Sequence, residues 1–257
     1  MSIYQHFRPD EKEFIDSVLN WKEYVEHSYS PKLTDFLDPR EQQILKMIIG
    51  EHSEVQYAFS GGFESAERKR ALIYPDYFQP QADDFHITLF EVEFAKKFLS
   101  LTHPQVLGSL MGLGLKRGKY GDIIIAGDRV QFVCAREVSE YIRLELHAVG
   151  KASVVLDEKP MTEVLLPEEV WTEQTATVSS LRLDTVLSAI FQLSRQKSQT
   201  LIQAGLVKVN WTAVENPSFE CGEGDTISAR KYGRAKILSI DGKTKKDKWR
   251  ITAGKQK

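Results

Sequence analysis

Basic and amide side chains recur at helical spacing near the C-terminus of this 257-residue chain. Arg195, Gln199 and Gln203 are four residues apart, so on a helix they lie in one row, and Gln196 follows the first of them. Arg182 precedes the helix before this row. A guanidinium group can grip a phosphate with two hydrogen bonds, and a side-chain amide can donate more. These residue types at this spacing predict a surface that binds a nucleic-acid backbone.

Further basic residues follow the row on predicted strands and turns: Lys208, Arg230, Lys231 and Arg234. If Arg230 and Arg234 pack on the same side as Arg182, the domain presents a basic groove. Lys208 and Lys231 have an alternative role, because a strand lysine can serve solubility alone. Asp184 is expected to be structural, either by holding Arg182 in place or by steadying the first helical turn.

Two helices and several strands must position these side chains. The first helix is amphipathic, because its apolar residues follow i, i+3, i+4, i+7, i+8 spacing: Leu183, Val186, Leu187, Ile190 and Phe191. The second, 195–203, has Ser194 as its cap and Gly205 just beyond its end. Alternating apolar residues predict strands over 207–211, 226–231 and 235–240.

This segment, about a quarter of the chain, resembles the S4 RNA-binding domain. The resemblance implies recognition of RNA mainly by shape and backbone. It is carried by Arg182-Leu183-Asp184, Ser194-Arg195, the run LIQAGLV over 201–207, Val209-Asn210, Gly224-Asp225, Arg230 and Gly233-Arg234.

Charge is divided unevenly along the chain. The net charge is −2, which by itself argues against a nucleic-acid-binding protein. Residues 180–257, however, hold 15 Lys and Arg against 7 Asp and Glu, whereas residues 1–179 hold 19 against 29. The split indicates a basic module attached to an acidic remainder.

The remaining patterns predict an α+β, multi-domain protein. An N-terminal α/β segment, 1–74, should hold helices starting near Pro9 and at Asp38-Pro39, a strand at 55–59, a polar helix at 64–70 and a strand at 71–74. After a linker, residues 85–158 show the order β-α-β-β-α-β, which is typical of ferredoxin-like and RRM-like domains. A second linker over 157–180 should lead into the S4-like domain, 180–257.

Two other clusters are candidates for RNA contact. Backbone N–H groups at Gly61 and Gly62, between a predicted strand and a predicted helix, can cradle a phosphate, or the glycines can simply permit a tight turn. Lys116 and Arg117 lie in a basic loop ahead of a strand. The basic residues close to the glycines are Arg68, Lys69 and Arg70.

No pattern indicates catalysis, a metal or a cofactor. The chain has no nucleophile elbow, paired-cysteine motif or HExxH motif. Cys134 and Cys221 are far apart in sequence, which suits a reducing cytosol. No run of eighteen apolar residues and no secretory signal is present, so we expect a cytoplasmic, monomeric protein that does not enter a membrane.

The chain as a whole resembles the YlmH family of bacterial S4-domain proteins. The resemblance implies a non-enzymatic factor that binds the large ribosomal subunit, with its ribosomal RNA, peptidyl-tRNA and quality-control factors as partners, while stalled chains receive C-terminal alanine tails. An RNA-modifying enzyme with an S4 targeting domain and a cell-division-associated scaffold are the alternatives. The matching residues are FSGGFESAERKR over 59–70, HPQVLGSLMGLG over 103–114, Arg117 with Gly121-Asp122-Ile123, and VSSLRLD over 178–184.

Overall fold

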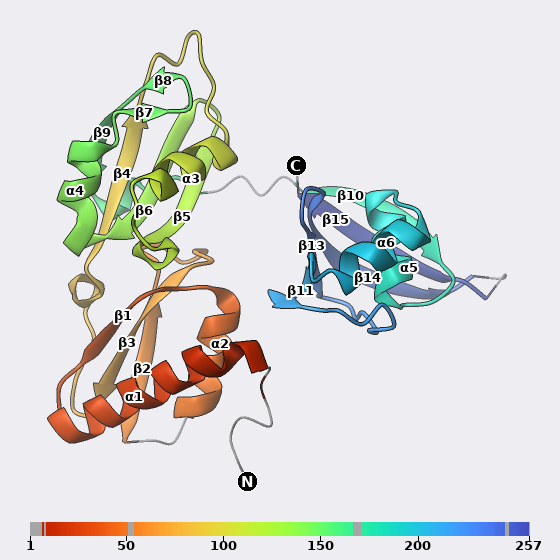
Figure 1. Ribbon diagram of the computed structural model, residues 1–257, viewed down its shortest axis with the longest axis horizontal. Coiled ribbons are helices and arrows are strands. Elements are labelled where there is room, and N and C mark those ends of the chain that lie inside the picture. The colour runs from red at the N-terminus through yellow and green to blue at the C-terminus, as the bar shows by residue number, and fades with distance from the viewer. Residues whose placement is uncertain (1–6, 8, 51–53, 167–170, 245–246, 257) are drawn as a thin grey trace. The chain divides into compact units, whose positions relative to one another are not determined.

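The structure is a computed structural model (Figure 1) that describes residues 7, 9–50, 54–166, 171–244 and 247–256. The chain divides into two compact units, Met1–Glu168 (unit 1) and Glu169–Lys257 (unit 2). Both mix helices with sheets, so the predicted α+β, multi-domain class is confirmed. No helix in the described part of the chain combines the length and apolarity needed to cross a membrane.

Unit 1 begins with two helices packed on a three-stranded sheet of order β1-β3-β2. The second helix starts where the sequence predicts, because Asp38 and Glu41 form a reciprocal capping box and Pro39 takes the first helical position. The elements are α1 (Lys12–Ser28), β1 (Lys32–Leu37), α2 (Pro39–Ile49), β2 (Val55–Ser60) and β3 (Lys69–Pro75).

Two expectations for this region are corrected. The polar helix predicted at 64–70 is wrong, because residues 64–68 form the connection between β2 and β3, and β3 already begins at Lys69. The strand β1 was not predicted. A register shift between Leu33 and Phe36 interrupts its alternation, so its pattern is weak in sequence.

The second part of unit 1 has the predicted β-α-β-β-α-β order. Its four strands are antiparallel in the order β5-β6-β4-β9, and Gly127 has a positive φ in the tight turn that joins β5 to β6. A small hairpin precedes the last strand. The elements are β4 (Ile87–Glu93), α3 (His103–Gly112), β5 (Tyr120–Ala126), β6 (Arg129–Ala135), α4 (Ser139–Glu145), β7 (Ala148–Val149), β8 (Ala152–Ser153) and β9 (Val155–Lys159).

The two parts of unit 1 share a core. Phe90, Phe132 and Cys134 face α3 and α4, whereas Leu89 and Val133 on the same two strands face the other way. That second sheet face packs against Phe36 of β1 and Leu72 of β3, and all of these side chains are almost fully buried. The N-terminal sheet therefore covers the face of β4 and β6 that helices leave open.

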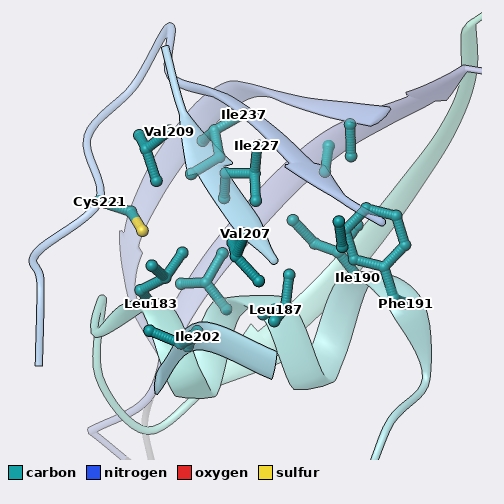
Figure 2. Close-up of a cluster of buried hydrophobic side chains, with 14 of the residues drawn as sticks. Leu183, Leu187, Ile190, Phe191, Ile202, Val207, Val209, Cys221, Ile227 and Ile237 are labelled. Carbon is teal, nitrogen blue, oxygen red and sulfur yellow. The ribbon is translucent and has the colours of Figure 1, made fainter. Parts of the chain in front are cut away.

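Unit 2 places two helices on one face of a six-stranded sheet of order β10-β15-β14-β13-β11-β12. Figure 2 shows Leu187 and Ile202 from the helices pointing toward Val207, Ile227 and Ile237 of the strands. The elements are β10 (Trp171–Val178), α5 (Leu183–Phe191), α6 (Arg195–Gln203), β11 (Val207–Val209), β12 (Thr212–Ala213), β13 (Thr226–Ala229), β14 (Gly233–Lys243) and β15 (Trp249–Gln256).

The linker predicted over 157–180 is corrected at both ends. β9 continues to Lys159, and β10 pairs along its whole length with β15, so residues 171–178 belong to the sheet of unit 2. Val178 is part of the core of unit 2, and Ala176 packs against it. The boundaries 1–74, 85–158 and 180–257 stay predictions; the compact units divide between Glu168 and Glu169, outside the described residues.

Candidate nucleic-acid interface

A buried carboxylate organises the predicted row on the helices of unit 2. Asp184, in the first turn of α5, has no exposed surface. Its oxygens accept hydrogen bonds from Arg182 Nε (3.1 Å), Arg195 Nε (3.1 Å) and Gln199 Nε2 (2.8 Å). Thr185 Oγ1 donates a further one. One acid thus gathers side chains from before α5 and from α6 at a single place.

This arrangement fixes the charge state of Asp184. Burial alone would raise the pKa of the carboxyl, but hydrogen bonds from Arg182, Gln199 and Arg195 outweigh it and hold the pKa well below its usual range. The carboxylate is therefore ionised at neutral pH. It fixes one edge of each guanidinium group. The rest of each group is open to solvent, as the exposed fractions of the Arg182 and Arg195 side chains, 39% and 54%, show.

The structural role expected for Asp184 is therefore confirmed, and it is larger than the sequence indicated. The carboxylate holds Arg182 in place, as one alternative proposed, and it also orients Arg195 and Gln199. Gln196 and Gln203 are exposed on α6, at its first turn and its last residue. The described geometry offers two oriented guanidinium groups and nearby amides, which suits binding of phosphate oxygens.

The basic residues on the strands do not join this surface. In the antiparallel register Lys208 lies opposite Ser228, and Ser228 lies opposite Arg234, so the three point to one face of the sheet. The alternate residues Val207, Ile227 and Ala235 face the helices. Lys208 and Arg234 therefore point away from α5 and α6, and the single groove envisaged from sequence is not formed by them.

Arg230 and Lys231 lie at the turn between β13 and β14. Both side chains are exposed, and Lys231 adopts a positive φ of 74°. The guanidinium carbon of Arg234 lies 5.7 Å from the ring centroid of Trp211. These residues stay predicted RNA contacts, on a different part of the domain from Asp184.

The glycine pair in unit 1 serves packing. No helix follows Gly62, whose φ of 91° is left-handed, so there is no helix N-terminus to attract a phosphate. A Cβ at Gly61 would lie 2.3 Å from that of Ala66, and one at Gly62 would lie 2.8 Å from the sulfur of Met161. The tight-turn alternative therefore fits this geometry.

Arg70 is an interior residue. It is 3% exposed, and its guanidinium donates to the carbonyl oxygens of Thr34 and His86 and to both carboxylate oxygens of Glu137. An RNA contact by Arg70 is thus contradicted, because its side chain is occupied in joining the two parts of unit 1. Burial raises the pKa of Glu137, but hydrogen bonds from Arg70 and Lys119 lower it to about 2 overall.

Arg68 and Arg117 are also largely engaged within unit 1. Arg68 donates to the Phe36 carbonyl (2.9 Å), and Arg117 donates to those of Tyr120 and Gly121. Burial is the main cause that lowers the pKa of Arg117 to about 10. Lys69 is half-buried, with its Nζ 3.4 Å from the Glu64 carbonyl oxygen, and Lys116 is exposed. Of these four, Lys116 remains the most accessible predicted contact.

The two central strands of the second part of unit 1, β4 and β6, offer no open face for stacking bases. The strands β4 and β6 are buried on both faces, with α3 and α4 on one and the N-terminal sheet on the other. Gln131 and Glu91 also lie on these strands, are buried, and hydrogen-bond to each other. This agrees with the sequence of β6, which lacks the aromatic signature of an RNA-recognition motif, and its single aromatic residue, Phe132, faces α3 and α4.

Two further kinds of reactive group in the described part of the chain are the metal-binding side chains and the thiols. No cluster of three or more His, Cys, Asp or Glu suited to a metal occurs in the described ranges. Burial raises the pKa of Cys134 and also that of Cys221, the latter to about 12, so both thiols stay protonated at neutral pH.

Comparisons with known proteins match the chain along its whole length. Family models match residues 10–78 ("YlmH, N-terminal"), 80–163 ("Putative RNA-binding domain in YlmH") and 181–227 ("S4 domain"). The "Ribosome-associated protein quality control protein P2" of Bacillus subtilis (strain 168) is 49% identical over 255 residues, 99% of each chain. A solved structure, "Cell division protein ylmH from Streptococcus pneumoniae", is 37% identical with a TM-score of 0.55, and covers 64% of this chain and 100% of its own.

Proposed function

The chain belongs to the YlmH family, and we propose that it is an RNA-binding factor that associates with the ribosome in quality control of stalled nascent chains. One observation in the structure supports this most: Asp184 orients Arg182 and Arg195 toward solvent from two different elements. Exposed, fixed guanidinium groups of this kind suit phosphate contacts. The Bacillus subtilis relative, which matches over 99% of both chains, is named as a ribosome-associated quality control protein.

The finer assignment concerns the target. We propose that the helix surface of Arg182, Arg195 and Gln199 contacts ribosomal RNA of the large subunit, next to peptidyl-tRNA, and that the protein acts in the cytoplasm without catalysing a reaction. In this role it supports C-terminal alanine tailing of the stalled chain. Mass spectrometry of a stalled reporter tests this directly, because cells that lack the protein should lose the alanine tails.

Arg195→Gln should weaken binding to purified large ribosomal subunits at least fivefold. The amide keeps a hydrogen-bond donor for Asp184, so the fold is retained while the charge and the fork geometry are lost. Co-sedimentation at several salt concentrations measures the change, and loss of one phosphate contact should reduce the log–log salt slope by about 0.7 to 0.9.

Lys197→Gln is the matched control, since Lys197 is exposed on the same helix but lies two positions from Arg195 and faces another direction. Both variants lose one positive charge. Equal weakening by the two would show that general charge, and not the surface around Asp184, determines binding.

A further inference from the structure

The positive charge of unit 2 is concentrated outside the stretch that matches the S4 family. Residues 181–227 hold four basic and five acidic residues, a net charge of −1. Residues 228–257 hold eleven basic and two acidic residues, a net charge of +9. The excess of cations that distinguishes this part of the chain therefore lies after the stretch that matches the S4 family.

Alternation along the strands places three of these cations, and also Lys208, relative to the core. Ala235, Ile237, Ile251 and Ala253 face the helices. The neighbouring residues that alternate with them along each strand face the other way, and they include the exposed side chains of Lys236 and Arg250. We call this the outer sheet face, and its basic residues are Lys208, Arg234, Lys236 and Arg250.

The rest of the outer sheet face is rich in hydroxyl groups. Cross-strand partners share a face, so Thr226 lies with Lys236, Thr177 lies with Arg250, and Ser239 lies with Thr252. Two acids, Glu173 and Asp241, interrupt it. Asp241 accepts hydrogen bonds from Ser239 Oγ (2.8 Å) and Thr252 Oγ1 (3.4 Å), so its carboxylate is partly satisfied within the sheet.

The face continues onto the projecting β14–β15 hairpin (Figure 1). A hollow of about 690 Å³ lies there, lined by Thr177 of β10 and by Lys243, Lys248 and Arg250 of the hairpin among others. The Nζ of Lys243 lies 5.5 Å from the ring centroid of Trp249 and 2.7 Å from a carboxylate oxygen of Asp247. Cations, hydroxyl groups and one concave region are thus continuous over three neighbouring strands.

We propose that the outer sheet face is a second RNA-binding surface, separate from the helix surface of Arg182 and Arg195, and that it holds the sugar–phosphate backbone. Cations and hydroxyl groups outnumber the two acids on this face, and such groups recognise phosphate and ribose without reading base edges. The two surfaces lie on opposite faces of one sheet, so the domain can hold two RNA segments at once. This inference rests on the proposed RNA-binding function.

The test uses the full chain carrying Lys236→Gln together with Arg250→Gln. Both side chains are exposed on strands, so the substitutions leave the packing of the core of unit 2 intact. If each contacts one phosphate, the log–log salt slope for large ribosomal subunits should fall by about 1.4 to 1.8, and binding at 0.1 M salt should weaken roughly 30-fold. The same drop in slope is expected for total tRNA as a naked RNA probe.

A double variant of unit 1, Lys97→Gln with Lys151→Gln, is the control, because both lysines are exposed and the net charge changes equally. Equal effects of the two double variants on both probes would overturn the inference. If the wild-type chain binds tRNA with a slope that only Lys236→Gln/Arg250→Gln reduces, yet does not bind large subunits, the outer sheet face is supported and the ribosomal role fails. Loss of subunit binding through Arg195→Gln alone, with Lys236→Gln/Arg250→Gln at wild-type affinity, supports the ribosomal role and overturns the second surface.

Discussion

Asp184→Ala is expected to lower the free energy of unfolding of unit 2 by about 3 kcal/mol, because it removes the buried acceptor of three charged or amide donors, at about 1 kcal/mol for each hydrogen bond. It should also weaken RNA binding at least tenfold. Arg182, Arg195 and Gln199 each donate to this carboxylate, so all three lose their shared position. Hydrogen exchange of peptides from α5 and α6 measures the stability of unit 2 separately from that of unit 1.

The direction of the binding change makes this test specific. Removing an acid adds one unit of positive charge, which by itself strengthens attraction to RNA. Glu220→Ala makes the same charge change at an exposed position, so it should bind RNA as well as the wild type or more tightly. If Asp184→Ala also binds as the wild type does, orientation of the two arginines is unimportant and the proposed interface is wrong.

Asp184→Asn separates stability from positioning further. The amide keeps the volume of the side chain but offers one acceptor oxygen and places an N–H₂ group against cationic donors. We expect a smaller loss of stability than with alanine and still a clear loss of RNA affinity. Because the pKa of Asp184 is held below its usual range, its contribution in the wild type is complete above about pH 4 and is lost only on stronger acidification.

Local signals in the sequence predict much of the fold. The helix start at Asp38-Pro39 and the spacing of Leu183 to Phe191 each depend on neighbours within a few residues, and each is found where expected. The sequence does not predict strand β10, because its core-facing residues include Gln174 and Ala176 and so do not form an alternating pattern of large apolar residues. Gln174 can face inward because its side-chain amide donates to the Ile190 carbonyl, 16 residues away.

The candidate site shows the same limit. The row of Arg195, Gln199 and Gln203 on α6 follows from helical periodicity. Asp184, the carboxylate that binds two of these side chains, lies on α5, and from the sequence a contact with it could be proposed only for Arg182. The side on which Lys208 and Arg234 point depends on the register of three strands. Arg70 belongs to a run of basic residues that resembles an exposed patch, but its partner Glu137 is 67 positions away in sequence. Pairings at such distances leave no local pattern.

Arg70→Met should lower the free energy of unfolding of unit 1 by about 3 kcal/mol, because the buried guanidinium group donates hydrogen bonds to two carbonyl oxygens and to the half-exposed Glu137 carboxylate, and all of these are lost. Methionine fills much of the space but leaves the carbonyl oxygens of Thr34 and His86 without their donor. Arg136→Met is the control. Arg136 pairs with Asp83 at 2.6 Å, but both side chains are well exposed, so the cost there should be much smaller than for Arg70→Met.

The pH dependence distinguishes lost pairing from a simple packing defect. The folded-state pKa of Glu137, about 2, lies below that of an unfolded glutamate, so its stabilisation is present above about pH 4.3 and is lost as the pH falls toward 2. In Arg70→Met the pKa of Glu137 should return toward its ordinary value. The difference in stability between wild type and variant, followed by hydrogen exchange of β3 and β6 peptides, should therefore shrink between pH 4.5 and 2. A difference that stays constant over this range would assign the loss to packing and contradict the ion pair as the link between the two sheets.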